Sequence, residues 1–110
     1  MIHIITARVT PQQMKDMLEA LQTYVKLAVD IQRQIVAGGG ALHADCEAVL
    51  LEDGSLQQDI WGADWIPETQ EVRFESLINI RPKAGNRSLS IADSALRSTI
   101  ESIVSEKFAT

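Results

Sequence analysis

The chain has few of the residues that mark specialised classes of protein. It contains one cysteine, Cys46, in 110 residues, so an internal disulfide is excluded. No apolar run approaches the roughly 18 residues that a membrane-spanning helix needs, so we expect no membrane insertion. Basic residues are also scarce, because 10 Lys and Arg accompany 15 Asp and Glu for a net charge of -5. A phosphate backbone would meet net repulsion, which argues against nucleic acid as a partner.

The remaining composition is that of an ordinary globular domain. Hydrophobic residues make up 45% of the chain and charged residues 23%, and neither repeats nor low-complexity tracts are present. A chain of this length can bury one ordinary core without disulfides. We therefore expect a single domain over residues 1–110. The lone cysteine and the lack of a charged and apolar leader favour a soluble, cytoplasmic protein.

The first third of the sequence predicts a short strand and then a long helix. Residues 1–5 are mostly apolar and β-branched, which is typical of a strand. Thr10, Pro11 and Gln13 form a helix start with a capping box. Apolar residues then recur every three or four positions to about Ala37, which predicts one helix to that point. The glycines at 38–40 lack the lysine and hydroxyl of a phosphate-binding loop, so we interpret them as its C-terminal cap and hinge.

The middle and end of the sequence predict three strands and a second helix. The strands span Cys46 to Leu51, Leu56 to Ile66 and Val72 to Arg81, with Asp53-Gly54 as a two-residue hairpin turn. A capping box at Ser90 and Asp93 begins a helix that ends near Phe108. The expected fold is α+β in the order β-α-β-β-β-α, an antiparallel three-stranded meander plus the short N-terminal strand. Both helices would pack on one face.

The hairpin turns predict which side chains share a face of this sheet. The Asp53-Gly54 turn would set His43 opposite Asp64 and Cys46 opposite Trp61, and a loop at residues 67–70 would set Asp64 opposite Arg73. One face would then be the core, with Ala44, Cys46, Ala48, Leu50, Trp61, Ala63, Trp65, Val72, Phe74, Ile78 and Ile80. Because this places Cys46 and both tryptophans in the core, we expect them to be structural.

The other face divides into an apolar part and a polar part. The apolar part groups Val49, Leu51, Leu56, Ile60 and Leu77. Such patches usually mark contact sites, so we predict a homo-oligomer through this patch, with the long helix as the other candidate surface.

The polar part of that face would group His43, Asp45, Glu47, Asp64, Arg73 and Glu75. A solvated face with cross-strand ion pairs explains this pattern most simply. A histidine among carboxylates can also hold a divalent metal, for which His43, Asp45 and Asp64 are the candidates, or act in acid–base chemistry. No zinc spacing or nucleophile motif selects among these, so catalytic residues and cofactors stay open.

A basic stretch before the last helix offers a second candidate site. Arg81, Lys83 and Arg87 flank Gly85-Asn86, and such a loop can fold around an anionic group with help from Ser88 and Ser90. A solvated loop that offsets the acidic domain is the simpler interpretation.

Four segments carry a resemblance to known proteins. The residues at 42–51, the run Trp61-Gly62-Ala63-Asp64-Trp65 and the stretches 78–82 and 85–88 resemble a family of short bacterial proteins of unknown function, over nearly the whole chain. That family implies no activity, cofactor or catalytic residue. The expected element order is also similar to that of the RelE/ParE-like toxins, which are typically basic enzymes, although fold order does not establish function.

The leading hypothesis is therefore a dimeric, non-enzymatic binding module. Its candidate ligand residues are His43, Asp45, Glu47, Asp64, Arg73, Arg81 and Arg87. A toxin-like enzyme and a metal-dependent site are the alternatives.

Overall fold

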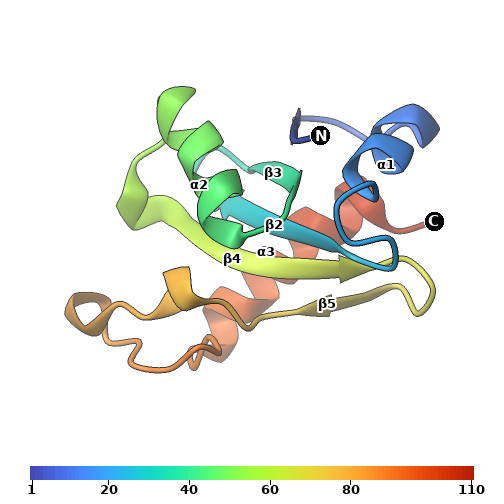
Figure 1. The fold of residues 1–110 in the computed structure, drawn as a ribbon. Helices are drawn as coiled ribbons and strands as arrows, with labels where there is room; N and C mark the ends of the chain where they lie inside the picture. The colour runs from blue at the N-terminus through green and yellow to red at the C-terminus, as the bar shows by residue number, and fades with distance from the viewer.

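A five-stranded antiparallel sheet and three α-helices make up the fold in the computed structural model, which describes residues 1–110 (Figure 1). The strands are β1 (His3–Ile5), β2 (Val25–Asp30), β3 (Ile35–Gly40), β4 (Ile60–Ile66) and β5 (Glu71–Arg73). The helices are α1 (Pro11–Met17), α2 (His43–Glu52) and α3 (Ser94–Phe108), and short 3-10 turns η1 (Gln57–Asp59), η2 (Leu77–Asn79) and η3 (Pro82–Ala84) complete the chain. The strand order across the sheet is β1-β3-β2-β4-β5. The α+β class is confirmed, and the element order is β-α-β-β-α-β-β-α.

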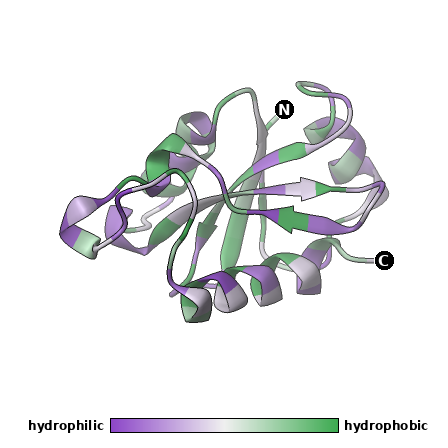
Figure 2. Cartoon of the chain, turned by 90° about the horizontal axis from the view of Figure 1, so that it is seen from below, coloured by the Kyte–Doolittle hydropathy of each residue, from purple (hydrophilic) through white to green (hydrophobic).

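Helices cover both faces of the sheet, so the expectation that they pack on one face is wrong. In Figure 1, α2 lies in front of the sheet and α3 behind it. The face toward α3 holds the larger core, 14 buried residues that include Trp61, Trp65 and Phe108. The face toward α2 holds a smaller core of Ala28, Ile35, Ala37, Cys46, Leu50 and Ile60. Figure 2 shows the apolar positions of the strands between the two layers of helix.

Several local predictions are confirmed. The Thr10 hydroxyl accepts from the backbone N–H of Gln13, and the Gln13 side chain accepts from the backbone N–H of Thr10, which completes the capping box of α1. The loop at residues 67–70 joins β4 to β5 and pairs Asp64 with Arg73 as expected. The last helix ends at Phe108, although its N-cap is Asp93 instead of Ser90. These features depend on neighbours in sequence, which is why pattern reasoning finds them.

The long first helix is wrong, because the hairpin of β2 and β3 occupies its second half. The segment Val25 to Asp30 alternates between apolar residues toward the α3 core and others toward α2. The apolar residues of this segment also fit the three- and four-residue spacing of a helix, which is why the sequence predicted a helix here. The turn between β2 and β3 contains no Gly, Pro or Asn-Gly, so the sequence gives no signal of a turn there. It is stabilised by the Asp30 carboxylate, which accepts from the backbone N–H groups of Gln32 and Arg33.

The expected strand from Cys46 to Leu51 is helix α2. Cys46 and Leu50, four residues apart, are its fully buried positions, whereas Ala44 and Ala48 are exposed instead of lying in the core. Asp53-Gly54 ends this helix and forms no hairpin. Gly54 has φ +103°, and Gly54 and Ser55 donate back to carbonyls of the last turn. The dipeptide is thus a helix C-cap, a second use of the same left-handed backbone preference.

The expected last strand, Val72 to Arg81, is also wrong beyond Arg73. There the chain leaves the sheet, and the Asn79 side chain takes the place of a strand. Its Oδ1 accepts from the Gly62 N–H at 2.8 Å and its Nδ2 donates to the Gly62 carbonyl at 3.0 Å. Gly62 is required because a Cβ there would lie 2.6 Å from the Ser76 side chain. Asn79 therefore satisfies the edge of β4 that β5 leaves open.

The glycines at 38–40 belong to β3 and are not a helix cap. A Cβ on Gly39, whose φ is +108°, would lie 3.0 Å from the Cα of Met17, and one on Gly40 would lie 3.2 Å from the Cys46 Sγ. These glycines let α1 and α2 approach the sheet closely. No helix in the fold has the length and apolar character to span a membrane.

Candidate functional site

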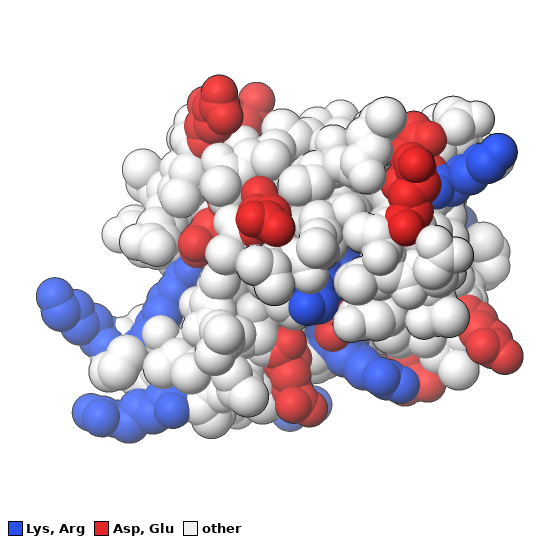
Figure 3. All heavy atoms as spheres, viewed as in Figure 1, with Lys and Arg blue, Asp and Glu red and all other residues white.

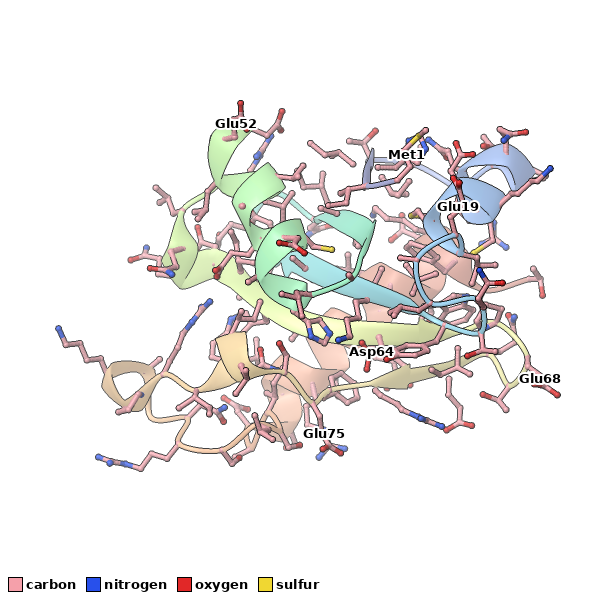
Figure 4. The ribbon with its side chains drawn as sticks, viewed as in Figure 1. Met1, Glu19, Glu52, Asp64, Glu68 and Glu75 are labelled. Carbon is pink, nitrogen blue, oxygen red and sulfur yellow. The ribbon has the colours of Figure 1, made fainter.

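A cleft of about 400 Å³ lies where α2 stops covering its face of the sheet. The start of β2, the N-terminus of α2, β4 and the chain after β5 all contribute to it. Its lining residues are Tyr24, Lys26, Leu42, His43, Ala44, Asp64, Glu75, Ser76, Leu77, Ile78 and Leu89. Figure 4 shows Asp64 on β4 and Glu75 on the chain that runs below it. Polar groups thus meet in a concave site, where binding and catalytic sites usually lie.

His43 and Asp64 form a hydrogen-bonded pair in this cleft. The His43 Nε2 lies 2.7 Å from the Asp64 Oδ1 and 3.1 Å from the Ala63 carbonyl oxygen. Both partners are acceptors, so Nε2 carries a proton. The side chains are 10% and 14% exposed. The Nδ1 makes no hydrogen bond within the chain and is not among the buried unpartnered atoms. Its hydrogen-bonding capacity is therefore available to a ligand.

The other histidine provides an internal comparison. The His3 Nε2 lies 2.9 Å from the Asp16 Oδ2, and these side chains are 26% and 18% exposed. The hydrogen bond from His3, together with one from Gln12, lowers the pKa of Asp16 below its ordinary value. Neither residue lines this cleft. Both histidines thus pair with an aspartate. What distinguishes His43 is that its pair lies in the cleft.

Two further side chains in the cleft have polar groups without partners in the chain. Lys26 lies opposite Asp64 in the sheet but forms no ion pair with it or with any other carboxylate. The Tyr24 hydroxyl also makes no hydrogen bond within the chain, although Tyr24 is half-buried. The rim is apolar, with Leu42, Leu77 and Leu89 exposed by 57%, 77% and 42%. A polar floor with an exposed apolar rim is typical of a binding site.

The expected polar cluster is only partly assembled. His43 and Asp64 meet, but through a helix and a strand instead of paired strands. Asp45 points elsewhere from α2 and is exposed, and Arg73 is exposed on β5 without an ion pair. No three His, Cys, Asp or Glu side chains lie close enough to hold a metal ion. The grouping of His43, Asp45 and Asp64 as metal ligands is therefore wrong.

Glu47 and Arg81 belong to an adjoining groove of about 930 Å³, which shares Leu77 and Ile78 with the cleft. The Arg81 guanidinium lies 3.3 Å from the Glu47 carboxylate and 4.8 Å above the Trp61 ring, and only 15% of its side chain is exposed. Burial lowers the pKa of Arg81, while the Glu47 charge opposes this shift. These contacts engage the Nη2 atom and the flat face of the guanidinium, whereas the buried Nη1 of Arg81 has no partner in the chain.

The rest of the basic stretch is also organised by structural contacts. Asn86 is buried, and its amide donates to the carbonyls of Asn79, Ser88 and Ser90. Arg87 is exposed and makes no ion pair. Figure 3 shows acidic and basic side chains spread over this side of the molecule, with no large patch of one sign.

Sequence reasoning missed Tyr24 and Lys26 as site residues because it assigned both to the long helix. The alternation of Val25, Leu27 and Val29 with polar or small residues was the available signal. Leu89 and Ser76 enter the cleft only through the irregular chain after β5, for which the sequence carries no periodic pattern.

Comparisons with known proteins identify the family of the chain. No curated protein and no solved structure matches it. The likeness to RelE/ParE-like toxins rested on an element order that the structure does not have. One family model, described as "Protein of unknown function (DUF5674)", matches residues 3–107, nearly the whole sequence. The chain therefore belongs to the DUF5674 family.

Proposed function

We propose that the protein is a non-enzymatic binding module and that the His43 cleft is its ligand site. The observation that carries this proposal is that His43, Lys26 and Tyr24 line one cleft, while the His43 Nδ1, the Lys26 ammonium and the Tyr24 hydroxyl have no partner in the chain. Polar groups are normally paired once they leave bulk water. Groups that converge without partners are ready to bind a ligand without rearrangement, which reduces the entropic cost of binding.

A catalytic role is the alternative, because a carboxylate that orients a histidine is also an acid–base arrangement. A nucleophile beside the Nδ1 would favour it. Ser76 is the only serine, threonine or cysteine that lines the cleft, but its hydroxyl accepts from the backbone N–H of Ile78, and Ser76 is 5% exposed. Binding uses the groups as they stand, which is why it is the better-supported function.

Two substitutions on α2 test the cleft as a ligand site. Ala44 lines the cleft, whereas Ala48 lies one turn further along the same helix and does not line it; both are exposed. We expect Ala44→Leu to fill the cleft and abolish binding of fragments found in an NMR screen of a small-metabolite library. Ala48→Leu should leave binding unchanged. Equal binding by both variants, or no fragment that shifts cleft amides, would refute the proposal.

The binding module is also proposed to act as a homodimer. Of the five aliphatics expected in the contact patch, Ile60 is fully buried and Val49 is half-buried, but Leu51, Leu56 and Leu77 are exposed by 40%, 59% and 77%. Ile80, which the sequence placed in the core, is also exposed, by 42%. Leu77 and Ile80 line the Arg81 groove. Exposed aliphatics at this density favour a protein contact. Light scattering at micromolar concentration should give twice the 12.1 kDa chain mass, and Ile80→Glu should restore the single mass. A monomeric wild type would refute dimerisation.

A further inference from the structure

The Arg81 groove holds a mostly buried cation that the chain satisfies only in part. The Arg81 guanidinium carries several N–H donors, but its side chain makes one hydrogen bond, from Nη2 to the Glu47 carboxylate at 3.3 Å. The buried Nη1 has no partner. Buried donors without acceptors are rare in native proteins, and each calls for an explanation. The groove is therefore short of acceptors and of negative charge.

Lys83 adds a second positive charge to the same groove. It belongs to η3, is exposed and forms no ion pair. Glu47 is the only carboxylate among the lining residues, so Arg81 and Lys83 leave the groove net positive in a chain of net charge -5. Exposed aliphatic side chains form its walls. An occupant that complements the groove combines an apolar side chain with a carboxylate.

The C-terminal end of α2 presents this combination. Leu51 and Glu52 are neighbouring exposed residues there, and Glu52 forms no ion pair. A carboxylate at this position faces the negative end of the helix dipole, and the last turn of α2 has no basic residue to offset it. The adjacent Asp53 is paired with Arg33. Glu52 is thus the carboxylate at this helix end that lacks a counter-charge.

The end of α2 and the groove lie at the same end of the molecule, on either side of η1 (Figure 1). Gln57 and Gln58 of η1 line the groove, and the exposed Leu56 precedes them in the chain. An acidic end and a basic groove thus flank an exposed apolar centre. Such a face is complementary to itself under a two-fold rotation, because the acidic end of each copy then meets the basic groove of the other.

We propose that the Arg81 groove binds the C-terminal end of α2 from a second copy of the chain, and that this exchange occurs twice in a two-fold dimer. The partner's Glu52 pairs with Lys83 and supplies negative charge that Arg81 lacks. The partner's Leu51 packs on the apolar walls of the groove. This inference rests on the proposed dimerisation and adds which surfaces meet and why the groove is incomplete in a single copy.

Charge reversal at the two exposed positions tests this pairing. Glu52→Lys would place two ammonium groups together at both contacts of the dimer, and Lys83→Glu would place two carboxylates together. Each variant should therefore dimerise at least about tenfold more weakly than the wild type. Light scattering over a dilution series measures the dissociation constant, and a circular dichroism spectrum like that of the wild type checks that each variant is folded.

A mixture of the two variants is the sharper test. In a mixed dimer, an ammonium meets a carboxylate at both contacts, so an equimolar mixture should recover the dimer mass at concentrations where each variant alone is monomeric. Lys15→Glu and Glu19→Lys are the matched controls, because they make the same two charge reversals at exposed positions of the α1 region. Neither control should change the dissociation constant.

The outcomes separate this inference from the proposed dimer. If the wild type is dimeric and neither reversal weakens it, the inference fails and the dimer stands. Weakened variants whose mixture stays monomeric would also overturn the inference, because the two residues would not meet across the interface. Equal weakening by the controls would reflect net charge and likewise overturn it. A monomeric wild type would refute both the inference and the dimer, whereas fragment binding at the His43 cleft is measured independently.

Discussion

The two faces of the sheet differ in how completely helices cover them. The face toward α3 buries 14 clustered residues, with contributions from β1, α1 and the last helix. The face toward α2 buries six, and α2 begins at His43, whose side chain contacts Asp64 at the edge of the covered area. The uncovered remainder forms the cleft. One face thus accounts for most of the apolar burial, and the other leaves polar groups accessible, which is the division expected between a scaffold and a site.

The largest effect should come from the α3 face. Phe108 is 1% exposed, and its ring centroid lies 6.0 Å from that of Trp65. Phe108→Ala should lower the free energy of unfolding by about 4 kcal/mol, because it opens a cavity in the larger core. Urea denaturation measures this change. Leu50→Ala, fully buried on the other face, should cost less; an equal cost would show that both faces contribute alike.

The next largest effect should come from Asn79, which supports the cleft side. Asn79 is fully buried, and its side chain satisfies the N–H and carbonyl of Gly62 and donates to the Phe74 carbonyl. Asn79→Ala leaves these groups unpaired and should cost about 3 kcal/mol in urea denaturation. Asn79→Asp keeps the shape but loses the donors, so it should also be destabilised. A neutral result for either would mean that water replaces the side chain.

Arg81 should matter for stability and Arg87 should not. Arg81→Ala removes the contact with Trp61 and leaves the mostly buried Glu47 carboxylate unpaired, so we expect a loss of about 2 kcal/mol. Arg87 is exposed and unpaired, and Arg87→Ala should stay within about 0.5 kcal/mol of the wild type. Thermal melts of the two variants, which carry the same change in charge, make the comparison. Equal melting temperatures would contradict the structural role of Arg81.

The smallest effect concerns the thiol under α2. Burial raises the pKa of Cys46 to about 11. An unfolded thiol has a pKa of about 8.5, so this group should contribute its full stability below about pH 8.5 and lose it as the pH rises toward 11. At pH 8 the native protein should therefore react very slowly with a thiol-specific disulfide reagent. The urea-unfolded protein should react quickly. Rapid reaction of the native protein would show that α2 opens readily.

Local signals were reliable where neighbouring residues decide the structure. The cap at Thr10, the loop at 67–70 and the end of α3 at Phe108 are set by nearby hydrogen bonds and turn preferences. Where periodicity admitted two answers, the sequence was insufficient. Residues 25–37 fit a helical stripe, and residues 46–51 fit a strand. The alternatives differ only in which distant segments the apolar residues contact, and single-sequence patterns do not contain that information.

The sequence by itself determined the composition of this protein, the capping box at Thr10, its α+β character and the chemistry of His43 and Asp64. The tertiary structure alone decided that residues 43–52 form a helix, α2, whose first residue brings the His43 imidazole to Asp64 on β4. It alone placed Lys26 and Tyr24 in the same cleft. It also decided that Arg81 and Asn86 serve packing. The physical reason is that burial and the convergence of polar groups depend on contacts between residues far apart in the chain, and only folding establishes them.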